Sequence, residues 1–388
     1  MAEIYAYIAD RKPTADSGIA VCSYDAEKGC LRHLRTELQG MGLHIGMMLL
    51  CDDMDVLYCT DETTRHPSRR SGGGGRILAF SVDRATGALA LLSETASYGA
   101  KPSYIEMDET RRYLLVTNHG GRETVTCTAR GENGEFTIET HSDESNVVLF
   151  PIRPDGSLDA PADIYKLSGR GPRPFQNSAH AHSIKRLMGE NCYVICDKGG
   201  DGIYTMKVDY RRRKIVPCGE GIVPCAAGSA PRYSAVHPRE PYVYVNKESA
   251  CKLTVFRALK SGALKLAQTI DNTPAKSVEV PKDVLIQSDI CISTDGQYLY
   301  DMLRIYDVIQ VYRIDNKTGR LALIQTIDTP PDGRSMTISP DGRFIACTFA
   351  SAGRTEVYPI CGDGTLGAAV SRVYGADPSC LCFCEKCN

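Results

Sequence analysis

Several charged side chains stand where predicted β-strands begin or end, and their types suit anion binding and proton transfer. Arg232 stands at the start of a predicted strand, whereas Glu248 and Arg304 each follow an apolar run. A guanidinium group can hold phosphate or carboxylate through two parallel hydrogen bonds, and a carboxylate can accept a proton. Taken singly, each is more often a solvated loop charge or half of a surface ion pair than a functional residue. These residues indicate a binding or catalytic site only if the fold brings them together.

Four further residues belong to the same group of candidates. His180 and His182 are two apart, so on a strand they would share one face. No third ligand at tight spacing accompanies them, as a metal site would require. Arg334 occupies a strand-start position like that of Arg232, and Asp289 lies where another inner strand is expected.

A short phrase recurs along the chain and predicts the elements that must position these residues. An alternating apolar strand leads into a turn rich in Asp, Asn or other polar residues, followed by Gly, one residue and Leu. The turn supplies the positive φ that a tight hairpin needs. Six clear copies and one degenerate copy give about 55 residues per unit. The copies end at Leu31, Leu89, Leu158, Leu264, Leu321 and Leu366, and the degenerate copy ends at Ile215.

A second phrase, a polar turn followed by an apolar strand, precedes the first in several units; its clear copies are 293–300 and 339–346. No helical period appears. All-β repeats of this size predict a seven-bladed β-propeller, and we expect one domain over residues 1–388. WD-type repeats are excluded because the chain has no Trp. The tail cysteines Cys380, Cys382, Cys384 and Cys387 include an alternating run, which predicts a last strand that closes the ring on the first blade.

Composition narrows the function classes. Lys and Arg number 45 and Asp and Glu number 47, a net charge of −2, so a nucleic-acid binder is not expected. No signal peptide and no apolar run of about 18 residues is visible, so neither export nor a membrane span is expected. Seventeen cysteines without an export signal favour reduced thiols, and hence the cytoplasm.

The order of these phrases resembles the seven-bladed propeller lactonase family, which includes bacterial 6-phosphogluconolactonases and fungal carboxy-muconate lactonizing enzymes. The resemblance runs from about Ile4 to Phe383. The family has a Glu sixteen residues after the Arg of its Pro-Arg phrase and an Arg nine residues after the Asp of its Asp-Gly phrase. The same spacings separate Arg232 from Glu248 and Asp295 from Arg304. The motifs that carry the resemblance lie at residues 101–118, 180–184, 231–238, 295–304 and 333–345.

The resemblance implies a set of site residues. The catalytic group would be His182, Arg232, Glu248 and Arg304, with His180 as a helper. Asn118, which with His119 replaces an Asn-Tyr pair of the family, would bind substrate. We expect the same of His180, Asp289 and Arg334. No metal or other cofactor is implied.

These residues predict a lactonase that hydrolyses a sugar lactone similar to 6-phosphogluconolactone, in carbohydrate metabolism. Arg232 and Arg304 would hold an anion or the oxyanion, and Glu248 with His182 would transfer protons. One alternative is a muconate-cyclase-like lyase or isomerase, or another enzyme acting on a small anionic metabolite. Another is a propeller that only binds, which an exposed apolar patch on one face would favour. The expected partner is a small anionic substrate, and the expected state is a monomer or weak homo-oligomer.

Overall fold

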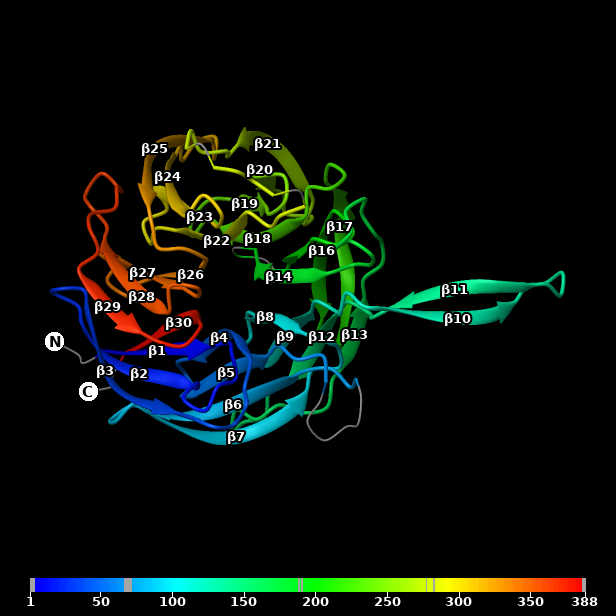
Figure 1. Cartoon of the computed structure of the whole chain (residues 1–388), viewed down its shortest axis with the longest axis horizontal. Helices are drawn as coiled ribbons and strands as arrows, with labels where there is room; N and C mark the ends of the chain where they lie inside the picture. The colour runs from blue at the N-terminus through cyan, green and yellow to red at the C-terminus, as the bar shows by residue number, and fades with distance from the viewer. Residues whose placement is uncertain are drawn as a thin grey trace.

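The computed structural model describes residues 4–65, 72–187, 189, 191–276, 278–281 and 283–385. Seven four-stranded antiparallel sheets stand around a central axis (Figure 1). No helix occurs in these ranges, and therefore none that could cross a membrane. The predicted seven-bladed β-propeller is confirmed, since each repeat forms one blade.

Each blade contributes four strands in order from the axis outward. The innermost strands are β30 (Pro378–Glu385), β4 (Ile45–Cys51), β8 (Pro102–Met107), β14 (Ala181–Arg186), β18 (Pro231–Val236), β22 (Gln287–Ile292) and β26 (Gly333–Ile338). The second strands are β1 (Ile4–Asp10), β5 (Val56–Asp61), β9 (Tyr113–Asn118), β15 (Tyr193–Asp197), β19 (Tyr242–Lys247), β23 (Tyr298–Leu303) and β27 (Phe344–Phe349). The second strands are almost wholly buried because both of their faces pack against neighbouring blades.

The outer half of each blade is a hairpin. The third strands are β2 (Ile19–Asp25), β6 (Arg76–Asp83), β12 (Asn146–Pro151), β16 (Gly202–Asp209), β20 (Lys252–Ala258), β24 (Val308–Ile314) and β28 (Arg354–Pro359). The outermost strands are β3 (Cys30–Glu37), β7 (Ala88–Ala96), β13 (Asp163–Lys166), β17 (Lys214–Pro224), β21 (Leu264–Asp271), β25 (Leu321–Asp328) and β29 (Ser371–Tyr374).

The repeated phrase forms the turn between the third and outermost strands in all seven blades. Its glycine has a positive φ, as at Gly87 (70°) and Gly319 (70°), and the degenerate copy has Arg213 at 54° in that place. The residue that ends the phrase is buried in every blade, from Leu366 at 4% exposed to Leu89 at 8%. This burial explains why an apolar residue recurs there: it attaches the hairpin to the core.

The C-terminal strand closes the ring, as predicted. Strand β30 pairs antiparallel with β1, from Ile4 opposite Glu385 to Ala9 opposite Cys380. Cys380 and Cys384 pack in the apolar cluster between this blade and the next, whereas Leu381 faces the last blade. The thiols therefore fill a buried strand surface; Cys387 lies outside the described residues.

A β-bulge interrupts every blade near the start of its innermost strand. In one blade Ala181 pairs with Asp197 and Ser183 with Cys196, so His182 between them has no partner across the ladder. The other six blades shift register at the same place. A bulge re-aims the side chain of its extra residue, and here the shift recurs at one mouth of the channel.

One blade carries an insertion, the hairpin β10 (Thr124–Arg130) and β11 (Phe136–Ser142), which projects away from the ring (Figure 1). It leaves between β9 and β12 and is exposed along most of its length. Phe136 and Ile138 are more than two thirds exposed. The hairpin therefore contributes little to the core.

Candidate active site

A cavity of about 370 Å³ lies at the mouth of the channel where the bulges occur. Two positions of the repeat supply twelve of its residues. The second residue of the innermost strand lines it in six blades, as Gly46, Ser103, His182, Arg232, Arg334 and Ser379. The residue directly after the second strand does so in six blades, as Arg11, Glu62, His119, Lys198, Glu248 and Arg304. Lys101, Arg122, Tyr233 and Leu285 complete the wall.

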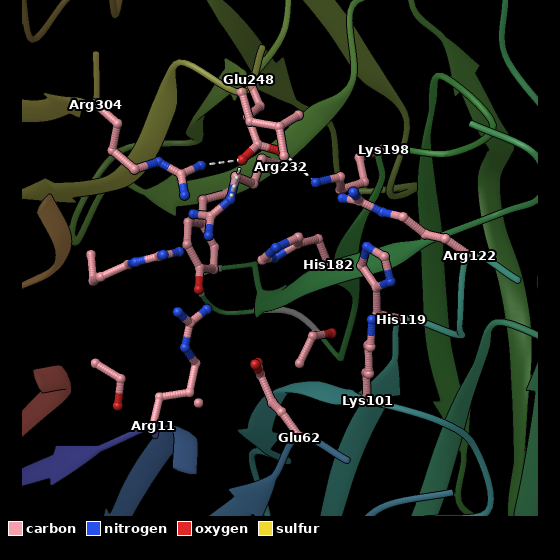
Figure 2. Close-up of a pocket in the computed structure, with 16 residues that line it drawn as sticks. Arg11, Glu62, Lys101, His119, Arg122, His182, Lys198, Arg232, Glu248 and Arg304 are labelled. Carbon is pink, nitrogen blue, oxygen red and sulfur yellow. Dashed lines mark hydrogen bonds and ion pairs between the residues drawn. The ribbon is translucent and has the colours of Figure 1, made fainter. Parts of the chain in front are cut away.

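Glu248 lies at the centre of the charged cluster and is 1% exposed (Figure 2). Its Oε2 accepts a hydrogen bond from Lys198 Nζ at 2.5 Å. Its Oε1 lies 3.0 Å from Arg232 Nε and also accepts a hydrogen bond from Arg304. Arg232 in addition donates to the backbone carbonyl of Ser288. One carboxylate thus holds three cations from three blades.

The charge state of Glu248 follows from these contacts. Burial alone would raise its pKa, but the charges of Lys198, Arg232 and Arg304 outweigh burial and lower the pKa to about 2. A carboxylate this acidic is a poor base at neutral pH. Of the two residues predicted to transfer protons, Glu248 is therefore better suited to orient the three cations.

His182 has the properties of a neutral base. Burial, followed by the charges of Arg232 and Lys198, holds its pKa well below the usual value. Its Nδ1 has no hydrogen-bond partner among the described residues. The ring contacts Tyr233 edge-on, with centroids 5.2 Å apart. The imidazole is thus uncharged, held in place and available to take a proton from water.

Lys198 carries the proton most readily lost near neutral pH. Burial lowers its pKa, Glu248 opposes that effect, and the resulting pKa is about 8. Burial likewise lowers the pKa of Arg304, to about 10, and Arg304 therefore stays charged at neutral pH. Lys198 follows β15 just as Glu248 follows β19, and this position in the repeat is the signal that sequence reasoning overlooked.

The cavity is strongly basic although the whole chain is not. Seven of its lining residues are Lys or Arg and two are Glu, a net charge of +5 with neutral histidines, against −2 for the chain. Sequence reasoning had singled out only three of these cations, Arg232, Arg304 and Arg334. The ligand that this cavity favours is an anion.

The structure brings five of the predicted site residues together: His182, Arg232, Glu248, Arg304 and Arg334 all line the cavity. Asn118 and Asp289 lie elsewhere. Asn118 is buried and donates to Ser97 O and Asn146 Oδ1, so it supports the backbone. Asp289 lines a second cavity of about 420 Å³, where its Oδ2 accepts from the backbone N–H of Met336.

The prediction that His180 and His182 share one face is wrong. His180 precedes β14, and the bulge at His182 breaks the alternation. His180 is fully buried, its Nδ1 bonds the backbone oxygen of His119, and its ring stacks on His119 at 4.4 Å. It lies behind the cavity wall, where it positions His119. Across the described ranges no group of three His, Cys, Asp or Glu side chains is arranged to hold a metal.

The pH dependence of any reaction in this cavity should have two limbs. Activity is lost as pH falls through the lowered pKa of His182, because the protonated ring cannot act as a base. It declines again above about pH 8 as Lys198 loses its charge. Initial rates measured from neutral pH down through the acid limb and up through the alkaline limb, corrected for spontaneous hydrolysis, test this. Lys198→Arg, which stays protonated, should move the alkaline limb upward; an unmoved limb would rule out Lys198 as its source.

The geometry defines a seven-bladed β-propeller with a basic cavity at one mouth of its channel. The family model described as "Lactonase, 7-bladed beta-propeller" matches residues 5–383. The chain therefore belongs to this lactonase family, and the resemblance stated from the sequence is confirmed.

Two curated relatives and one solved structure are similar to this chain. A 6-phosphogluconolactonase of Bacillus subtilis is 25% identical over 189 residues, covering 48% of this chain and 46% of the relative. A 6-phosphogluconolactonase of Formosa agariphila is 25% identical over 259 residues, covering 66% of this chain and 64% of the relative. These matches span less than two thirds of each relative. The periplasmic gluconolactonase PpgL of Pseudomonas aeruginosa has a TM-score of 0.82 at 21% identity, covering 98% of this chain and 99% of its own, which shows a shared fold.

Proposed function

We propose that this protein is a lactonase that hydrolyses an anionic sugar lactone similar to 6-phosphogluconolactone. The single observation that carries the proposal is the cluster in which Glu248 holds Arg232, Arg304 and Lys198 beside the neutral His182. Membership of the lactonase family and the relatives named 6-phosphogluconolactonase support the choice of lactone.

A side chain of the cavity can carry out each step of lactone hydrolysis. His182 takes a proton from water as the water oxygen attacks the lactone carbonyl carbon. The carbonyl oxygen becomes an oxyanion, which Arg232 and Arg304 stabilise through charge-assisted hydrogen bonds. The ring carbon–oxygen bond then breaks, and the leaving ring oxygen takes the proton from His182. One water is consumed, and the product is the open hydroxy acid.

The test compares wild-type protein with Arg232→Ala on fresh 6-phosphogluconolactone and a panel of unphosphorylated sugar lactones. We expect hydrolysis above the spontaneous rate, and a loss of roughly 10²–10³ in kcat on removing one oxyanion donor. The control is Arg343→Ala, since Arg343 lies over the Phe344 ring on a turn outside the cavity. The proposal fails if Arg232→Ala and the control have equal rates.

The product distinguishes the lactonase from the lyase alternative. Hydrolysis adds one water to the substrate, whereas ring closure or elimination adds none, and mass spectrometry separates the two. The binding-platform alternative called for an apolar patch on one face. Large exposed apolar side chains are instead distributed over several outer strands and the inserted hairpin, as at Leu91, Leu266, Leu323, Phe136 and Ile138.

We place the activity in the cytoplasm as part of the same proposal. Sixteen cysteines of the described ranges are free thiols, and many are buried. Reduced cysteines in this number are typical of a reducing compartment.

A further inference from the structure

Two cations in the cavity wall, Lys101 and Arg122, have no carboxylate partner among the described residues. The other cations are paired. Arg11 lies 3.4 Å from Asp377, Arg334 lies 3.2 Å from Asp332, and Lys198, Arg232 and Arg304 share Glu248. Glu62 lines the same cavity, and burial raises its pKa against the opposing charges of several cations including Lys101, but the two side chains do not reach ion-pair distance. Lys101 and Arg122 therefore add two unpaired positive charges to the excess of the Glu248 cluster, where three cations share one carboxylate.

These two cations lie at one side of the cavity, around His119 (Figure 2). Lys101 directly precedes β8, and Arg122 lies at the root of the inserted hairpin. Burial is the main cause that lowers the pKa of His180, which stacks on His119, and the charges of Lys198, Arg122 and Lys101 lower it further. All three cations thus act on one small region.

An aromatic ring helps to hold this region in place. The guanidinium of Arg122 lies 5.8 Å from the centre of the Phe175 ring, and Lys198 Nζ lies 5.9 Å from the same centre. Two cations over one ring repel each other, and only Lys198 has a carboxylate nearby. A bound dianion would remove this repulsion and accept hydrogen bonds from both Arg122 and Lys101.

We propose that Lys101 and Arg122 form a subsite for the phosphate of the substrate, separate from the Glu248 cluster that acts on the lactone carbonyl. This inference rests on the proposed lactonase activity and adds the residues that select a phosphorylated lactone. Arg122 offers two parallel donors to phosphate oxygens, and Lys101 contributes a point charge. The inserted hairpin thereby contributes a specificity residue to the site from which it projects.

The experiment compares kcat/KM for 6-phosphogluconolactone and for gluconolactone in Arg122→Ala and Lys101→Met. We expect the ratio of the two values to fall roughly ten- to a hundredfold in each variant, the range for a lost charged hydrogen bond. Arg122→Lys should restore part of the ratio. The matched control is Arg130→Ala, because Arg130 lies on the same hairpin outside the cavity, with its guanidinium 4.7 Å from the centre of the exposed Phe136 ring. Its ratio should equal that of the wild type.

A lactone that carries a carboxylate in place of the phosphate distinguishes the two anions. If its rate falls in Arg122→Ala as much as that of the phosphorylated lactone, the subsite takes any anion and phosphate selectivity is refuted. Equal losses on charged and uncharged lactones would also overturn the proposal, because they would indicate a structural effect.

A binding measurement separates failure of the subsite from failure of the proposed activity. Inorganic phosphate should raise the Tm of the wild type and raise it less in Arg122→Ala and Lys101→Met. If the wild type hydrolyses no lactone, the proposed function fails, and this phosphate response still decides whether the subsite exists. Equal responses in the wild type and both variants would overturn the subsite.

Discussion

Glu248→Gln should abolish nearly all lactone hydrolysis, with kcat falling by roughly 10³ or more. The carboxylate of Glu248 gives one oxygen to Lys198 and the other to Arg232 and Arg304. An amide has only one oxygen, so its NH₂ group must face either the lysine or the arginines. The arginines that stabilise the oxyanion would then lose their orientation, and the effect should exceed that of removing one arginine.

Thermal stability and anion binding give an independent readout of the same change. Glu248→Gln leaves three buried cations without a counter-charge, which typically costs about 3–5 kcal/mol. For a chain of this length that corresponds to a Tm lower by roughly 4–6 °C. Added phosphate should then raise the Tm of the variant more than that of the wild type, because it replaces the missing negative charge.

The matched control for Glu248 is Glu356→Gln. Glu356 is also buried and pairs with two arginines, Arg354 at 3.0 Å and Arg372 at 2.8 Å, but it lies outside the catalytic cavity. We expect a stability loss without the thousandfold loss of kcat. If both variants lose activity in proportion to stability, the special role of Glu248 is refuted.

Ending the chain after Asp377 should prevent folding altogether. Strand β30 is the innermost strand of the first blade, so its removal leaves β1 paired only with β2 and exposes the interfaces with two neighbouring blades. The lost ladder, with the burial of Cys380, Leu381 and Cys384, amounts to roughly 10 kcal/mol or more. That is comparable with the whole net stability of a protein, about 5–15 kcal/mol.

Circular dichroism during heating and size-exclusion chromatography test this prediction. We expect the truncated chain to show no cooperative transition and to aggregate. The control removes more residues at a different place: Thr126–Thr140 of the inserted hairpin are replaced by Asn-Gly, which suits a two-residue turn. Because this hairpin is exposed, Tm should be unchanged. A monodisperse, cooperatively melting truncated chain would contradict the role given to ring closure.

Much of the architecture is readable from local signals. Each turn phrase depends only on neighbouring residues: a Gly or its substitute at positive φ, and a buried residue shortly after it. The number of blades therefore follows from counting the phrases. The alternating cysteines of β30 indicate a strand for the same local reason. The resemblance to the lactonase family, supported by the spacings from Arg232 to Glu248 and from Asp295 to Arg304, implied these members of the site.

The remainder of the site depends on contacts between blades that no local pattern encodes. The bulge at His182, which turns that ring into the cavity and leaves His180 behind it, arises from pairing with β15. Lys198 resembles any strand-end lysine until the ring brings it to Glu248, fifty residues along the chain. By itself the sequence determined the repeat, the ring and the candidate charges. Only the tertiary structure decided which of them share one cavity, because their pKa values and pairing depend on burial and on charges contributed by other blades.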